Sequence, residues 1–416
     1  MMLRRTSRAV LASLALALPL AGAATARPAL AANNVTITWE DYFAGCPKDP
    51  LCGAIDTLRK QYEASHPGVT IKRTTVQFAD LLPKVLQQAA THTLPDVLIL
   101  DNPQVQNFAS TGALADLTPY AKGWSQLGSY YSSSLSTATW QGKLYGVPIG
   151  NNDLALYYNK KMLKAAGIAK PPATWAELRA DAKKLTHGHI YGMGFSANAN
   201  EEGTFQWETV FWGNGGDLMH VADKAGVEAL TFWTGLVKDG SVSKSSLTWG
   251  QTEVENQFVA GNVAMQLNGP WNLPELRLTK GLDFGVAYMP RKTASMPPSS
   301  PLGGEVWTVP ASTPDKQKAA WDLVKWMQNP AYITRLDSLL SYLPAYKPAN
   351  RTMTERDPLL KVFGGILPTS KARAAVLGPK YPKASEAIYK AIQSALSGSQ
   401  TPAQALQTAQ STIGGL

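Results

Sequence analysis

The sequence has few of the residues that build metal and redox centres. Five histidines are scattered over 416 residues, and the only cysteines are Cys46 and Cys52. Their spacing is not the C-x-x-C of a redox motif, and no metal-binding partners stand nearby in the sequence. In an exported chain two cysteines this close favour a disulfide bond. The small loop it would close adds only about 2 kcal/mol of stability, so we expect it to fix one local loop. No metal and no cofactor are expected.

Short catalytic motifs are missing as well. The chain contains no G-x-S-x-G, no P-loop, no H-E-x-x-H and no G-x-G-x-x-G that follows a strand. A glycoside hydrolase needs two opposed carboxylates, which no short motif marks. We therefore expect a protein that is not an enzyme, with a secreted carbohydrate-active enzyme as the less favoured alternative.

Charged residues are sparse, at 17% of the chain, and the formal net charge is +9. Part of this charge lies in residues 1–32, which we predict to be a signal peptide. Arg4, Arg5 and Arg8 precede an uncharged apolar run, and Ala29-Leu30-Ala31 has the small-x-small pattern of a cleavage site. The chain is therefore expected in the periplasm, exported by the Sec route or, given the arginine pair, by the twin-arginine route.

Without the four arginines of this segment, 35 basic residues remain against 30 acidic ones, a net charge of +5. This mild and dispersed charge does not indicate nucleic-acid binding. What remains is long enough for two lobes rather than one core.

The first part of the remaining chain alternates strands and helices. Apolar patterning predicts strands over 35–39, 69–77 and 96–100, with helices over 55–65 and 79–91 between them. This order is typical of an open, mostly parallel sheet flanked by helices. Farther on, the predicted strands 144–149 and 154–158 lie almost end to end around a polar break, which suggests a crossing between lobes.

Polar and aromatic residues gather where the predicted strands end. Ligands of open α/β sheets bind outside the carboxyl ends of the strands. Carboxylates and amides there can hydrogen-bond hydroxyl groups, and an aromatic ring can cover the apolar face of a pyranose. Trp271 is the plainest case, because it stands in the turn just after an apolar strand. The alternatives for its ring are packing on the core and standing at the mouth of a cleft.

Short motifs extend this reading over the whole chain. In order they are ITWE (37–40), LPDV (94–97), GVP (146–148), LYYNK (156–160), PATWAEL (172–178), GNGGD (213–217), FVAGNVAM (258–265), GPW (269–271), GG (303–304) and YLP (342–344). With these motifs the chain resembles the family 1 extracellular solute-binding proteins of bacterial ABC importers. This group includes maltose-binding and glycerol-3-phosphate-binding proteins.

The resemblance implies an α/β fold, the type II-like clamshell of periplasmic binding proteins, with a mostly parallel, helix-flanked sheet in each lobe. The N-terminal lobe would comprise residues 33–150 and about 306–345. The C-terminal lobe would comprise residues 151–305 and about 346–416. The ligand cleft would lie between them, and the Cys46–Cys52 loop could form part of its lip.

The resemblance also implies a set of ligand-binding residues. They are Glu40, Asp41, Asp101, Asn152, Asp153, Phe205, Trp207, Trp271, Gly304, Glu305, Tyr342 and Arg373.

The implied function is the extracytoplasmic substrate-binding component of an ABC transporter. A monomer would bind a mono- or oligosaccharide by stacking and hydrogen bonds and deliver it to the membrane permease. The nearest alternative is the same fold binding glycerol-3-phosphate or another polyol, for which Arg373 is the only cation in the implied set.

Overall fold

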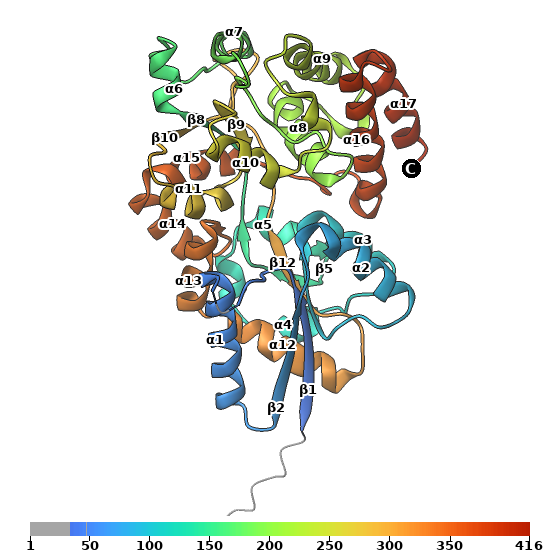
Figure 1. Cartoon of the computed structure of the whole chain (residues 1–416). Coiled ribbons are helices and arrows are strands. Elements are labelled where there is room, and N and C mark those ends of the chain that lie inside the picture. The colour runs from blue at the N-terminus through green and yellow to red at the C-terminus, as the bar shows by residue number, and fades with distance from the viewer. Residues whose placement is uncertain (1–33, 47) are drawn as a thin grey trace, which may run out of the picture.

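The computed structural model describes residues 34–46 and 48–416 of the chain. The predicted signal peptide, residues 1–32, lies outside this range. Within the described residues, none of the helices combines the length and the apolar character needed to cross a membrane. The chain forms two lobes (Figure 1). At one end of the molecule lie strands β1 (Val35–Asp41) and β2 (Val69–Thr75), and at the other lie helices α9 (Lys224–Lys238), α16 (Tyr381–Ser397) and α17 (Pro402–Gly414).

The first lobe is built on a five-stranded sheet in the order β2-β1-β3-β12-β6. Its strands are β1 (Val35–Asp41), β2 (Val69–Thr75), β3 (Val97–Asp101), β6 (Gly146–Pro148) and β12 (Glu305–Thr308). Both β2 and β3 pair with β1 in parallel. Only β12, which returns from far along the chain, runs antiparallel to its neighbours. The predicted mostly parallel sheet is therefore present in this lobe.

Helices cover this sheet on both sides. They include α1 (Pro50–Ser65), α2 (Phe78–Ala90), α12 (Pro314–Met327) and α13 (Pro330–Leu340). Helix α1 begins five residues before the predicted start, because Asp49 caps it and Pro50 is tolerated in its first turn. The core between the layers includes an edge-on pair of indoles, Trp39 and Trp307, with ring centroids 5.2 Å apart.

The second lobe has a smaller sheet in the order β10-β8-β9. Its strands are β8 (Ala155–Asn159), β9 (Met265–Asn268) and β10 (Phe284–Ala287), and β8 is antiparallel to both neighbours. This departs from the predicted mostly parallel sheet. The chain enters this lobe along β8 from the first lobe, and the two outer strands run the opposite way. The two-lobed α/β fold itself is confirmed.

The second lobe is rich in helices. The sheet and its surroundings pack against α7 (Trp175–Leu185), α8 (Glu201–Gly213), α9 (Lys224–Lys238), α16 (Tyr381–Ser397) and α17 (Pro402–Gly414). Helix α7 starts with a capping box formed by Thr174 and Glu177.

Short elements complete the chain. Their bounds are α3 (Val105–Ser110), α4 (Thr118–Ala121), α5 (Ser132–Thr137), β4 (Thr139–Trp140), β5 (Lys143–Leu144), β7 (Gly150–Asn151), α6 (Lys160–Ala165), α10 (Gln251–Val259), η5 (Pro270–Asn272), α11 (Leu273–Leu278), β11 (Pro301–Leu302), β13 (Leu343–Pro344), α14 (Lys347–Arg356), α15 (Pro358–Ile366) and β14 (Lys371–Ala372), with further single 3-10 turns between them.

Several chain segments run side by side where the lobes meet. Strand β7 pairs with β13, and Asn152 bridges to Gly303 through backbone hydrogen bonds. Gly304 has φ +123°, and a Cβ there would lie 2.1 Å from the carbonyl oxygen of Gly150. Only glycine fits this close approach, so the segments are held together at the backbone level.

Candidate ligand-binding cleft

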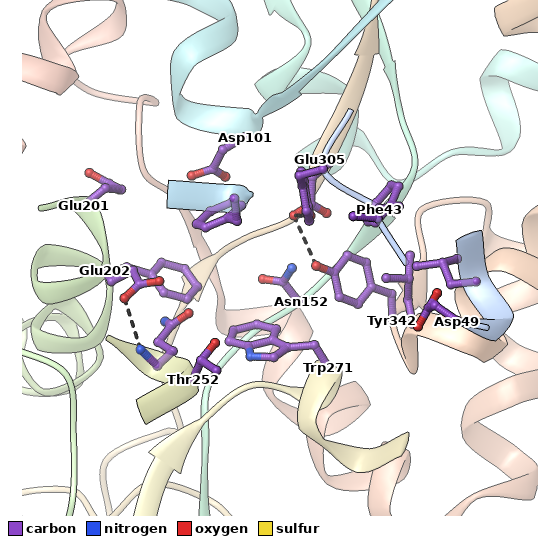
Figure 2. A pocket seen from close by; sticks show the side chains of 18 of the residues that line it. Phe43, Asp49, Asp101, Asn152, Glu201, Glu202, Thr252, Trp271, Glu305 and Tyr342 are labelled. Atoms are coloured by element: carbon purple, nitrogen blue, oxygen red, sulfur yellow. Dashed lines mark hydrogen bonds between the residues drawn. The ribbon is translucent and has the colours of Figure 1, made fainter. Parts of the chain in front are cut away.

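A cavity of about 370 Å³ lies between the two lobes. Figure 2 shows side chains from separate parts of the chain turned toward this shared space. Its lining consists of Tyr42, Phe43, Ala44, Asp49, Leu51, Phe78, Asp101, Asn152, Glu201, Glu202, Phe205, Gln251, Thr252, Trp271, Gly304, Glu305, Leu340, Tyr342 and Arg373. Aromatic rings and carboxylates together make up more than half of this set. A cavity that combines apolar surface with convergent polar groups is typical of small-molecule sites.

Eight of the twelve predicted site residues line this cavity. They are Asp101, Asn152, Phe205, Trp271, Gly304, Glu305, Tyr342 and Arg373. They come from the ends of β3 and β7, the start of β12, helix α8, the turn after β9, and the segments around β13 and β14. The structure thus brings together residues that lie up to 272 positions apart.

Glu40 and Asp41 do not line the cavity. Strand β1 continues to Asp41, two residues beyond its predicted end, so both side chains lie on the faces of the sheet. The carboxylate of Glu40 pairs with Lys84 over 2.7 Å. That of Asp41 is fully buried against Arg73.

Asp153 and Trp207 are also absent from the lining. Asp153 is fully buried, and among the described residues neither of its carboxylate oxygens has a hydrogen-bond partner. Burial raises its pKa well above the usual range. Trp207 stacks on Phe211 within the second core, at a centroid distance of 4.6 Å. It lies two residues after Phe205 on α8, and this spacing turns the two side chains to different faces of the helix.

Trp271 occupies an intermediate position between core and cleft. Its ring is half-buried and packs against apolar residues of both lobes. It also faces Phe205, with centroids 6.5 Å apart. A Cβ on Gly269 would lie 1.9 Å from the indole, so the glycine allows the ring to fold back beside its own turn. The ring is thereby held at the cavity with one part left accessible.

Arg373 is the only cation in the lining, and carboxylates already surround it. Its guanidinium donates to Asp101 over 2.5 and 3.0 Å and to Glu201 over 2.7 Å, while its side chain is 3% exposed. The same group lies over the ring of Phe205, 4.7 Å from its centroid. Burial acts to lower the pKa of Arg373, but Asp101 and Glu201 raise it, so the charge is retained. Burial raises the pKa of Glu201 despite the pairing.

Glu305 lines the cavity near Asn152 and Tyr342 (Figure 2). Its Oε1 accepts hydrogen bonds from the hydroxyl of Tyr42 over 2.5 Å and from that of Tyr342 over 3.1 Å. Its Oε2 is buried and has no partner among the described residues. Burial raises the pKa of Glu305 to about 7, although the two hydroxyl donors act in the opposite direction. A buried oxygen without a partner is costly, and Glu305 lines the cavity, so a ligand hydroxyl that reached this oxygen would satisfy it.

One side of the cavity contains none of the twelve predicted site residues, although the Cys46–Cys52 loop was a candidate for the lip of the cleft. Tyr42, Phe43 and Asp49 lie between β1 and α1, Leu51 lies in the first turn of α1 beside Cys52, and Phe78 begins α2. The predicted disulfide between Cys46 and Cys52 is confirmed. The sequence does contain one sign of this side of the cavity, the aromatic pair Tyr42 and Phe43 directly after strand β1.

Four polar residues of the second lobe were also missed. Glu201 and Glu202 lie in the first turn of α8, and Gln251 and Thr252 begin α10. The carboxylate of Glu202 accepts the backbone N–H of Gln251 over 3.0 Å, which joins the two helix starts. Helix beginnings that converge on one cavity are a tertiary feature, and the sequence carries no local sign of it.

Comparison with known proteins places the chain in a family. Residues 57–361 match the family model described as bacterial extracellular solute-binding protein. The chain belongs to this family. The family and the fold that its motifs predict are thus confirmed.

Relatives of this family member span most of its length. A binding protein of Brucella abortus (strain 2308) is 25% identical over 364 residues, which cover 85% of this chain and 87% of that protein. The galactooligosaccharide-binding protein of Bacillus subtilis (strain 168) is 23% identical over 399 residues, covering 91% and 88%.

Solved structures of binding proteins show the same fold. An ABC transporter solute-binding protein of Thermotoga lettingae, bound with α-D-tagatose, superposes with a TM-score of 0.82 at 25% identity, over 91% of this chain and 99% of that one. The cyclic α-maltosyl-1,6-maltose binding protein of Arthrobacter globiformis gives a TM-score of 0.75 at 26% identity, over 92% and 98%.

Proposed function

We propose that this chain is the substrate-binding component of an ABC importer and that it binds a sugar in the cleft between its lobes. The observation that carries this is that Trp271 and Glu305 line the same cavity. The ring of Trp271 is half-buried, and one carboxylate oxygen of Glu305 has no hydrogen-bond partner among the described residues. The ring suits the apolar face of a pyranose, and the oxygen suits a hydroxyl at its rim. Structural neighbours, one bound with α-D-tagatose and one a cyclic α-maltosyl-1,6-maltose binding protein, support the same ligand class.

The eight predicted residues that line the cavity are proposed as ligand contacts, together with Tyr42. Residues 33–150 and about 306–345 would move as one lobe against residues 151–305 and about 346–416. A sugar that bridges them would stabilise the closed form. The closed monomer would then dock on the membrane permease and release the sugar unchanged. Export to the periplasm, by either predicted route, completes this role.

The charges of the cleft argue against glycerol-3-phosphate. A phosphate needs cationic or N–H donors, but the lining contains Arg373 as its only cation and five carboxylates. The guanidinium of Arg373 is already bound by Asp101 and Glu201. A neutral sugar avoids the repulsion that an anion would meet there.

A thermal-shift screen tests the proposal. The panel contains glucose, galactose, maltose, cellobiose, tagatose, ribitol, glucuronate and glycerol-3-phosphate. A sugar at 100 times its dissociation constant stabilises the folded protein by about 2.7 kcal/mol. We expect at least one neutral sugar to raise the melting temperature and to be recovered chemically intact. Product formation from a bound oligosaccharide would instead establish the carbohydrate-active enzyme.

A further inference from the structure

One side of the cleft is made by the segment around the disulfide. Tyr42, Phe43, Ala44, Asp49 and Leu51 all line the cavity. Cys46 lies among them and is bonded to Cys52, which directly follows Leu51. We name these five lining residues the disulfide wall. It continues into Phe78, whose ring meets that of Tyr42 edge-on at 5.0 Å.

The disulfide wall has little regular structure of its own. It follows β1 and ends in the first turn of α1, where the carboxylate of Asp49 accepts the backbone N–H of Cys52 over 2.7 Å. Gly45 has φ +95° and turns the chain between the two. A stretch of this kind needs outside support to keep its rings at the cavity.

Arg73 supplies that support from the neighbouring strand β2. Its guanidinium donates to both carboxylate oxygens of Asp41 over 2.6 and 2.7 Å, and to the carbonyl oxygen of Phe43 over 2.6 Å. It also lies over the ring of Trp39, 5.4 Å from the centroid. Asp41 in turn accepts the backbone N–H of Phe43 over 2.8 Å. Arg73 and Asp41 together therefore hold the backbone of Phe43 at both its N–H and its carbonyl.

The same guanidinium reaches the disulfide. Its Nη1 lies 3.3 Å from Sγ of Cys52 and 3.7 Å from Sγ of Cys46. Arg73 is itself nearly buried, with 7% of its side chain exposed, and it is not part of the cavity lining. One planar cation thus connects the end of β1, the backbone of Phe43 and the sulfur bridge. A lysine has no such fork and cannot make these contacts together.

We propose that Arg73 and the Cys46–Cys52 bridge are positioning residues for the disulfide wall, and that the affinity of the cleft for its sugar depends on both. This rests on the proposed function. The wall would contact the sugar directly, through the rings of Tyr42 and Phe43. Arg73 and the bridge act through the wall. Because they order it before the ligand arrives, binding does not include the entropy cost of ordering it.

Two variants disturb the support without emptying the cleft. C46S/C52S removes the bridge and keeps residues of similar size. R73K keeps a cation beside Asp41 and loses the fork, which avoids leaving that carboxylate buried without any counter-charge. The matched control is R179K, since Arg179 makes a comparable two-nitrogen contact with Asp239 at the surface of the second lobe, over 2.5 and 3.1 Å.

Two measurements are made on the full mature chain. Isothermal titration with maltose, cellobiose and tagatose gives the affinity for each sugar. Hydrogen exchange read by mass spectrometry reports the backbone amides of Phe43, Ala44, Asp49 and Cys52. A role confined to overall stability would lower the melting temperature without selectively changing exchange in these amides.

We expect both test variants to bind the sugar about tenfold more weakly and to exchange faster in the disulfide wall, while R179K behaves as the wild type. Wild-type affinity in either variant, within twofold, would overturn the inference. Unchanged exchange in the wall would overturn it too. If the wild type binds none of the three sugars and none of the wider panel, the proposed function fails, and this inference fails with it.

Discussion

Arg373 donates to both carboxylate oxygens of Asp101, over 2.5 and 3.0 Å, although 272 residues separate them in the chain. Asp101 ends β3 of the first lobe, whereas Arg373 follows β14 and packs beside Phe205 on α8 of the second. A nearly buried ion pair therefore connects the two lobes at the cleft, and Glu201 provides the second carboxylate for the same cation.

Replacing Arg373 by an uncharged residue should destabilise the fold. Arg373→Met leaves Asp101 and Glu201 facing each other without a counter-charge. Breaking a buried pair from one side costs about 3–5 kcal/mol, and we expect the free energy of unfolding to fall by about that amount in urea denaturation. Arg179→Met, at an exposed pair with Asp239, should cost no more than about 1 kcal/mol. Equal losses in the free energy of unfolding would show that the ion pair at the cleft stabilises the fold no more than the exposed pair does.

Trp271→Ala should weaken sugar binding while changing the stability of the fold little. The ring is half-buried and lies at the cavity, so its loss removes the stacking surface for a pyranose. We expect the melting shift caused by the bound sugar to disappear, while the melting temperature without sugar changes little. Trp140→Ala, another half-buried indole that is outside the cavity lining, should leave the sugar shift intact. A large fall in the sugar-free melting temperature of Trp271→Ala would assign the ring to the core instead.

Glu305 should give the protein a pH dependence near neutrality. Its pKa in the folded protein, about 7, lies above the ordinary value of 4.5. The folded state therefore holds a proton that the unfolded state has lost between these values. The free energy of unfolding should fall as the pH rises through this window, by at most about 3 kcal/mol, and the contribution should be constant above it. Glu305→Gln should make the decline in urea titrations between pH 4 and pH 8 smaller than in the wild type, because other buried carboxyls such as Glu255 still contribute to it.

The same carboxyl should affect sugar binding. The ionised group is the better acceptor for a ligand hydroxyl, so sugar affinity in the wild type should rise through about pH 7. Glu255 is the matched control, because burial also raises its pKa, to about 8, and it is outside the cavity lining. Glu255→Gln should alter the stability profile and leave the affinity profile unchanged. An affinity in wild type that does not vary between pH 6 and pH 8 would contradict this role of Glu305.

Anionic ligands should bind poorly. Glucuronate differs from glucose by a carboxylate, and that charge would enter a cavity with five acidic side chains and one occupied guanidinium. We expect glucuronate and glycerol-3-phosphate to produce no melting shift at concentrations where a neutral sugar saturates the protein. Screening by salt should not rescue them, since partly buried charges are screened far less than exposed ones. Tight binding of glycerol-3-phosphate would favour that compound as the ligand, and tight binding of glucuronate would contradict the exclusion of anions by the five acidic side chains.

Several features of this protein could be predicted from residues that are close together in the chain. The alternation of apolar strands and helices specifies the first sheet, and Thr174 with Glu177 specifies the start of α7. The motifs identify the family, and the short spacing of Cys46 and Cys52 identifies the disulfide. Each of these depends on neighbours in the chain, which is why each could be predicted.

The tertiary structure alone decided which polar residues reach the cleft. Strand β1 runs two residues beyond its predicted end, and this places Glu40 and Asp41 on the faces of the sheet. The return of the chain as β12 puts Glu305 beside two tyrosines that come from opposite ends of the first lobe's sequence. The charge and burial of side chains at the cleft depend on residues hundreds of positions apart in the chain, so no local sequence pattern predicts them.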